Sequence, residues 1–114
     1  MNFKFIYKII EKDELLKINA KNTYLGSSKD LKDGFIHFSS EEQIEDTLKK
    51  YYTNQKNLKL LKVDTLKLDN LIWEQASDGS MFPHLYSSLD LSNVIDEFEL
   101  VLDEYGLHKL PANF

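Results

Sequence analysis

Apolar and polar residues alternate in several short segments of the chain, and this alternation predicts strands. The first strand is expected at 3–10, where three aromatic residues and Ile9 share one face while Ile6 and Lys8 share the other. Further strands are expected at 35–39, 58–64, 71–76 and 81–86. The Asp78-Gly79 pair favours a turn into the last of these strands.

The segment 81–86 contains Pro83, which lacks the backbone N–H that a strand interior would use. We therefore expect His84 to Tyr86 to lie near a strand end or at a sheet edge. For 94–102 two patterns compete, because Val94 and Phe98 fit a helical face whereas the β-branched pair Val94-Ile95 fits a strand. We favour a strand.

Two helices are predicted from helical spacing and end signals. The first spans 13–20 and begins at Asp13 as its N-cap. The second carries Ile44, Leu48, Tyr51 and Tyr52 on one face, and Ser40 with Gln43 has the spacing of a capping box at its start. Between them, 22–33 is polar and contains Gly26, Ser27 and Ser28, which predicts a loop. Two helices and five or six strands without regular alternation indicate an α+β fold with a largely antiparallel sheet.

Composition limits the classes of protein that the chain can represent. Its 114 residues, 42% of them hydrophobic, suit one domain spanning 1–114. The formal net charge is −5 and all 14 cationic residues are lysines, so we expect neither a nucleic-acid partner nor a membrane partner. The chain has no cysteine, and Lys4 and Lys8 interrupt its apolar start, so we expect a cytoplasmic protein without a signal peptide.

The segment DGFIHFS, 33–39, carries the first candidate site. An extended backbone places His37 and Ser39 on one face and Ile36 with Phe38 on the other, just before the predicted helix. Backbone N–H groups at a helix start can hold a ligand oxygen, and a histidine can donate, accept or move a proton near neutral pH. The plainer alternative is a half-buried His37 beside a serine that only caps the helix.

Two later segments add candidates. In LIWEQ, Trp73 and Glu74 point to opposite faces, so a buried indole would present a carboxylate that could act as a base or hold a ribose hydroxyl. In FPHLY, Phe82, His84 and Tyr86 share one face and could stack on a planar ring. The alternatives are a solvated edge-strand Glu74 and core aromatic residues.

A metal site is not predicted. His37, His84 and Glu74 would form a set of two histidines and one carboxylate, but they are far apart in the sequence and lack the short spacings typical of metal ligands.

Five segments in order resemble the domain of unknown function 952 family: IYKI (6–9), YLGSSKDLKDGFIHFSSEEQ (24–43), LKLLKVD (58–64), LIWE (71–74) and FPHLY (82–86). The resemblance covers nearly the whole chain. That family is grouped with the ADP-ribosyltransferase-like fold, so the resemblance implies split antiparallel sheets around a cleft for NAD.

ADP-ribosyltransferases place a His or Arg on the first strand, a Tyr or Ser on a strand entering a helix, and often a Glu on a later strand. In this sequence, Lys8 resembles the first of these positions, His37 with Ser39 the second, and Glu74 the third. Lys8 and His37 depart from the usual residue types, and a lysine cannot stack and accept as a histidine can. DGFIHFS also resembles a segment of RNA 2'-phosphotransferases, but those enzymes rely on arginines, which this chain lacks.

The resemblance implies a small cytoplasmic enzyme acting on NAD or a related nucleotide. Glu74 would hold a ribose hydroxyl and stabilise an oxocarbenium-like transition state, while His37 would orient the ligand or move a proton. The expected site residues are His37 and Glu74 for catalysis and, for ligand binding, Lys8, Ser39, Trp73, His84 and Tyr86. We predict that His37, Ser39, Glu74 and at least one of His84 and Tyr86 line a single pocket. A non-catalytic module for a small metabolite and a purely structural domain remain as alternatives.

Overall fold

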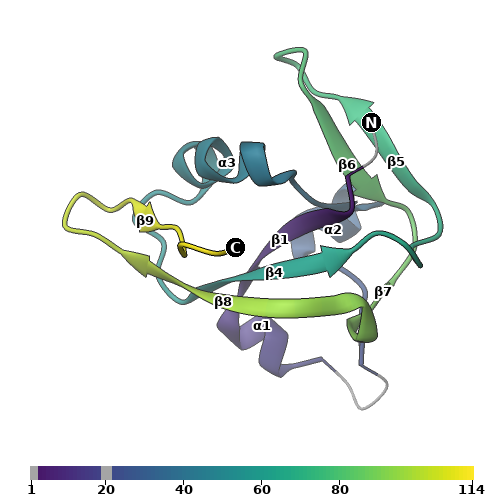
Figure 1. The fold of residues 1–114 in the computed structure, drawn as a ribbon, viewed down its shortest axis with the longest axis horizontal. Helices are drawn as coiled ribbons and strands as arrows, with labels where there is room; N and C mark the ends of the chain where they lie inside the picture. Colours follow the sequence, from purple (N-terminus) through teal and green to yellow (C-terminus); the bar gives the residue numbers. More distant parts are fainter. Residues whose placement is uncertain (1–2, 19–21) are drawn as a thin grey trace.

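The strands of the protein pair into three antiparallel sheets in the computed structural model, which describes residues 3–18 and 22–114 (Figure 1). The first sheet has the order β1 (Phe5–Glu11), β4 (Leu58–Asp64), β8 (Val94–Leu102), β9 (His108–Lys109). The second has the order β3 (Ile36–His37), β6 (Met81–Leu85), β5 (Leu71–Gln75), and the third pairs β2 (Thr23–Tyr24) with β7 (Leu89–Asp90). The helices are α1 (Lys12–Leu16), α2 (Ser28–Asp33) and α3 (Ile44–Tyr51), with short 3-10 turns at Glu41–Gln43 and Leu91–Asn93. This confirms the predicted α+β class and the antiparallel pairing.

Strand β1 is buried on both faces, whereas its alternation suggested one apolar face and one mixed face. Ile6 and Ile10 belong to one hydrophobic cluster, and Tyr7 and Ile9 belong to another on the opposite side of the sheet. Lys8 is also buried. A strand covered on both sides reads as a nearly continuous apolar run, which is the pattern of this segment.

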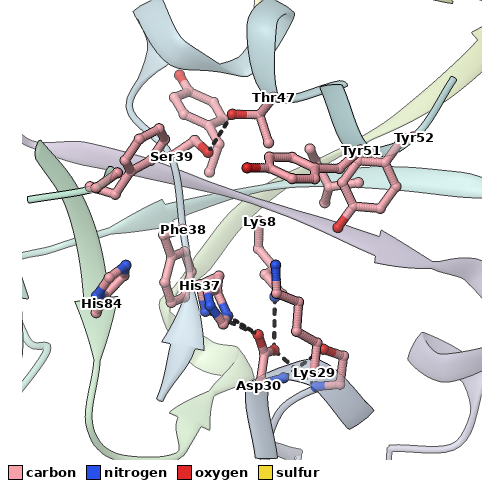
Figure 2. A pocket seen from close by; sticks show the side chains of 15 residues that line it. Lys8, Lys29, Asp30, His37, Phe38, Ser39, Thr47, Tyr51, Tyr52 and His84 are labelled. Atoms are coloured by element: carbon pink, nitrogen blue, oxygen red, sulfur yellow. Dashed lines mark hydrogen bonds and ion pairs between the residues drawn. The ribbon is translucent and has the colours of Figure 1, made fainter. Parts of the chain in front are cut away.

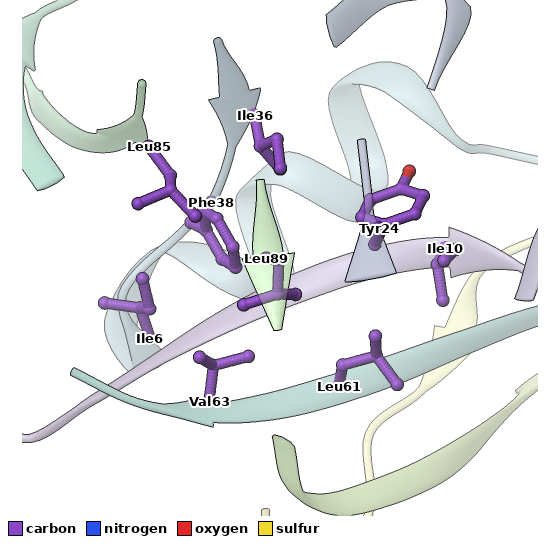
Figure 3. Close-up of a cluster of buried hydrophobic side chains, with 9 residues drawn as sticks. All are labelled: Ile6, Ile10, Tyr24, Ile36, Phe38, Leu61, Val63, Leu85 and Leu89. Carbon is purple, nitrogen blue, oxygen red and sulfur yellow. The ribbon is translucent and has the colours of Figure 1, made fainter. Parts of the chain in front are cut away.

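The first cluster joins the three sheets (Figure 3). Side chains of β1 and β4 meet side chains of the second and third sheets across one interface, and the cluster consists of Ile6, Ile10, Tyr24, Ile36, Phe38, Leu61, Val63, Leu85 and Leu89. Ile36 and Phe38, which the alternation placed on one face, both lie in this cluster. This contact fixes the second sheet against β1, where the pocket described below lies.

Helix α3 covers the other face of the first sheet. Ile44 and Leu48 are buried with Tyr7, Ile9 and residues of β4. The capping box of Ser40 and Gln43 is present, as predicted, at the start of the 3-10 turn that leads into the helix. Tyr51 is instead 66% exposed, so the helix buries a narrower stripe than its sequence indicated.

The segment 22–33 is not the loop that its polarity suggested. It contains β2 and helix α2, whose N-cap Ser27 forms a capping box with Asp30. Gly34 ends the helix in the left-handed conformation, with φ of 88°, and its N–H donates to the Asp30 carbonyl. The Ser27–Asp30 spacing was the available signal, but a helix that buries only a charged side chain has no apolar stripe to reveal it.

Helix α1 is shorter than the predicted helix over 13–20. It ends at Leu16, its N-cap is Glu11, and Asp13 lies in its first turn. The predicted residues 19 and 20 lie outside the described part of the chain.

Strand β3 is limited to two residues by the strand opposite it. His37 pairs with His84, and the Phe38 N–H donates to the Pro83 carbonyl at 3.1 Å. Pro83 has no N–H to return to Phe38, so the regular ladder stops there. Strand β6 is central in its sheet, so the sheet-edge alternative is wrong, but His84 and Leu85 end the strand, as the other alternative predicted. The proline is tolerated because β3 ends opposite it.

The remaining strands follow their predictions closely. The segments 58–64 and 94–102 are strands over their full predicted lengths, and the Asp78-Gly79 turn connects β5 to β6. A register shift between Lys62 and Val63 interrupts the pairing of β4 with β8. Within the described residues no helix has the length and apolar character needed to cross a bilayer.

We predict that Leu85→Ala destabilises the protein strongly, because Leu85 is fully buried between the sheets. The expected loss in free energy of unfolding is about 2–5 kcal/mol, measured by urea denaturation. Leu66→Ala is the matched control, since Leu66 is 85% exposed, and it should change stability by less than about 0.5 kcal/mol. Equal effects of the two substitutions would contradict the packing described here.

Candidate functional site

A pocket of about 420 Å³ lies where the first and second sheets touch. The contact is an isolated antiparallel bridge in which the Tyr7 N–H donates to the Ser39 carbonyl at 2.8 Å and the Ser39 N–H to the Tyr7 carbonyl at 2.9 Å. Residues of β1, α2, α3, the end of β3 and the β5–β6 hairpin line the pocket (Figure 2).

The polar contacts beside this pocket centre on the carboxylate of Asp30, in helix α2. Its side chain is 2% exposed, and its carboxylate accepts from Lys8 Nζ at 2.8 Å, Ser27 N at 2.9 Å, His37 N at 3.2 Å and His37 Nδ1 at 2.6 Å. Figure 2 shows His37 and Lys8 approaching the carboxylate from different strands. Sequence analysis did not identify Asp30, because a single aspartate in a polar segment gives no sign of burial.

The Lys8–Asp30 pair places two opposite charges in the interior. Burial by itself would raise the pKa of Asp30, but the hydrogen bond from His37 and the charge and hydrogen bond of Lys8 hold it well below its ordinary value. Asp30 is therefore ionised at neutral pH. Burial lowers the pKa of Lys8, whose side chain is 5% exposed, and the charge and hydrogen bond of Asp30 offset part of that lowering.

The backbone around Asp30 requires a glycine. Gly26 has φ of 120°, and a Cβ built there would lie 2.7 Å from Asp30 Cβ. A larger residue at Gly26 would thus both strain the backbone and push the carboxylate away from Lys8 and His37. The capping box then orients the same carboxylate from within its own helix.

Both ring nitrogens of His37 face carboxylates. Nδ1 lies 2.6 Å from Asp30 Oδ1, and Nε2 lies 3.1 Å from Asp33 Oδ2. The ring also contacts Phe35, with 4.5 Å between ring centroids. His37 is thereby held against helix α2.

His84 has a different environment on the adjacent strand. Its Nδ1 donates to Glu74 Oε1 at 2.7 Å, and the Tyr86 hydroxyl donates to the same oxygen at 2.6 Å. The hydrogen bonds from Tyr86 and His84 lower the pKa of Glu74, and the bond to Glu74 raises the pKa of Tyr86. Phe35 stacks on the His84 ring with 4.0 Å between centroids and an interplanar angle of 24°.

The structure brings four of the seven predicted site residues to the pocket. These are Lys8, His37, Ser39 and His84, and the Ser39 hydroxyl lies 3.4 Å from the Thr47 hydroxyl. Trp73, Glu74 and Tyr86 are not among the lining residues, so the expectation of one shared pocket is corrected. Strand β6 separates β5 from β3 in the sheet, and Glu74 reaches the pocket only through its bond to His84.

Trp73 lies on the opposite face of β5 from Glu74, as the alternation predicted. Its indole is partly buried, packs against the first hydrophobic cluster and contacts Phe3 with 5.0 Å between ring centroids. This position serves packing, since the indole faces the core and not the pocket.

Other lining residues were not singled out from the sequence as site residues. Helix α3 contributes Thr47, Tyr51 and Tyr52, and α2 contributes Lys29, whose Nζ lies 5.1 Å above the Tyr51 ring. The two tyrosines were assigned to a core stripe, and their position at helical spacing could not reveal that they border a pocket. Across 3–18 and 22–114, no group of three or more His, Asp or Glu side chains is arranged to hold a metal ion.

The geometry defines a small α+β domain with a pocket at the junction of two antiparallel sheets. The chain belongs to the family described as a protein of unknown function (DUF952), whose model matches residues 9–97. A comparison with curated proteins gives no match.

Solved structures of one bacterial relative are similar over almost the whole chain. The crystal structure of protein CC0527 from Caulobacter crescentus is 42% identical, covers 93% of this chain and 94% of that chain, and has a TM-score of 0.87. The solution NMR structure of CC0527 is 42% identical, covers 92% of this chain and 91% of that chain, and has a TM-score of 0.81. The arrangement of sheets and helices is therefore shared with that protein.

We predict that Asp30→Asn destabilises the protein by about 3–5 kcal/mol, because it leaves the buried Lys8 ammonium without its counter-charge. The change keeps the shape of the side chain, so the loss reports charge rather than packing. Asp90→Asn, at an exposed position, is the control and should cost far less. If the double variant Lys8→Met with Asp30→Asn is no more stable than Asp30→Asn alone, the ion pair is not the cause.

The same carboxylate predicts a dependence of stability on pH. Because folding lowers the pKa of Asp30 from its ordinary value of 3.8, its contribution is present above that value and is lost as pH falls further. The difference in free energy of unfolding between the parent and Asp30→Asn should therefore stay nearly constant from about pH 6 to about pH 5 and shrink as pH is lowered further, through 3.8 towards about 3. Urea denaturation at several pH values measures this; a constant difference would contradict it.

Proposed function

We propose that the pocket binds a small molecule that combines a planar ring with hydroxyl groups, and that NAD or a related nucleotide is the first candidate. The lining supports this: Tyr7, Tyr51, Tyr52 and Phe82 offer aromatic surface, and the hydroxyls of Ser39 and Thr47 offer hydrogen bonds. Mostly apolar walls with a few placed polar groups are the usual composition of small-molecule sites.

The charges around the pocket favour a ligand with little negative charge in its buried part. Lys8 is already neutralised by Asp30 at 2.8 Å, so it does not offer a free cation to a phosphate. Lys29 at the edge of the pocket, above the Tyr51 ring, could contact one phosphate that remains near solvent. A nucleoside part inside and a phosphate outside would match this distribution.

The position of Glu74 favours binding over ADP-ribosyl transfer. The ADP-ribosyltransferase-like resemblance is supported by the meeting of Lys8 and Ser39, two of its matching positions, at one pocket. Transfer would need a carboxylate beside the ribose carbon. Because Glu74 does not line the pocket and Asp30 is fully engaged, we favour a non-catalytic module that binds a small metabolite.

NMR titration of the labelled protein tests this proposal. Of NAD, ADP-ribose and nicotinamide, at least one should shift amide resonances of pocket residues, with the largest changes near Ser39, Thr47 and Phe82. If none of the three shifts these residues, the nucleotide assignment is wrong. Conversion of NAD to products under the same conditions would show that the site is catalytic.

Filling the pocket should abolish this binding. Ala76 lines the pocket and is half-buried, so Ala76→Leu should weaken binding of the same probe at least about tenfold by occupying its space. Ser77→Leu adds a leucine at the next, exposed position and should leave the affinity unchanged. Isothermal titration calorimetry measures both, and equal affinities would place the ligand elsewhere.

A further inference from the structure

Two imidazoles on the outer face of the second sheet each contact a carboxylate, but only one keeps a ring nitrogen available. His37 and His84 are paired across β3 and β6, and their ring centroids lie 5.5 Å apart with an edge-to-face angle of 66°. Both line the pocket. Because the hydrogen-bond partners of the two rings differ, the two histidines can offer different groups to a ligand.

His37 has no nitrogen left for a ligand. Nδ1 contacts Asp30 at 2.6 Å and Nε2 contacts Asp33 at 3.1 Å, so both donate when the ring carries two protons. Its backbone N–H donates to Asp30 as well. Moving a proton at His37 would require breaking one of these contacts.

His84 uses only Nδ1. That nitrogen donates to Glu74 on β5, Nε2 lies on the other side of the imidazole ring, and the residue lines the pocket. Within residues 3–18 and 22–114, no hydrogen bond or ion pair involves His84 Nε2. The stack with Phe35 and a side chain only 16% exposed hold the ring in this orientation.

We propose that His84 Nε2 is the hydrogen-bond acceptor that the pocket offers to its ligand and that Glu74 and Tyr86 are positioning residues for it. The bond to Glu74 keeps the proton on Nδ1, which leaves the lone pair on Nε2. The inference rests on the proposed function in that the pocket receives a small ligand. It assigns the imidazole that contacts the ligand to His84 and not to His37.

The contact is a hydrogen bond and needs no transfer of the proton. A hydroxyl of the ligand donates to Nε2, and the proton stays on the ligand oxygen. Tyr86 donates to the same Glu74 oxygen as His84 and favours the ionised form of that carboxylate, which accepts from Nδ1.

A measurement on the ligand-free protein tests the geometry. Nitrogen-15 NMR of the histidine rings, at a pH where they are neutral, should find His84 protonated at Nδ1 and unprotonated at Nε2. Glu74→Leu removes the acceptor and should shift His84 towards the other tautomer. Gln75→Leu is the control on the same strand, pointing to the other face, and should leave the tautomer unchanged. A proton on Nε2 in the parent protein would overturn the proposal.

A second measurement tests the contact with a ligand. With whichever of NAD, ADP-ribose or nicotinamide binds, the His84 Nε2 resonance should move while Nδ1 changes little, and His84→Leu should weaken binding about tenfold. Binding that leaves Nε2 unmoved overturns the role of His84 but not the pocket. If no probe binds, the proposed ligand class is wrong, and the tautomer in the free protein still decides whether His84 is the open imidazole.

Discussion

The buried ion pair between Lys8 and Asp30 determines how the rest of the site is arranged. Removing two charges from water is costly, and each becomes tolerable only when the other is present with further hydrogen bonds. Asp30 meets this condition through Lys8, Ser27 and two donors of His37. The pair therefore ties β1 to α2, and through His37 it also ties α2 to the second sheet.

This connection explains why a polar segment takes a defined place against the core. Helix α2 buries no apolar residue, so hydrophobic packing alone does not fix it. Its position is set by its carboxylate, by the capping box and by the close approach of Gly26. The pocket lies beside this helix, at the isolated bridge between Tyr7 of β1 and Ser39, which follows β3 in the chain. In this arrangement Asp30 already neutralises Lys8, the most buried cation of the pocket.

How far the sequence predicts this structure depends on the kind of interaction that forms each element. Alternation located β4 and β8 because burial of one side chain in two is a local property. It also placed Glu74 on a different face from Trp73. It could not show that β6 separates β5 from β3, since strand order depends on contacts between distant segments, and so Glu74 was expected in the pocket. Helix α2 was missed for a related reason: Asp30 is buried by partners 22 and 7 residues away.

The two histidines illustrate how one sheet face can support two different roles. The Nδ1 of His37 contacts Asp30 and its Nε2 contacts Asp33, so neither ring nitrogen is left for a ligand. His37 therefore contributes to the structure of the junction between the sheets. His84 is held by Glu74 through one nitrogen and keeps the other for whatever enters the pocket. A carboxylate that does not line a pocket can still act on it by orienting an imidazole. Because Glu74 does not line the pocket, direct stabilisation of a cationic sugar by this residue is disfavoured. Glu74 instead acts on the pocket by orienting the imidazole of His84.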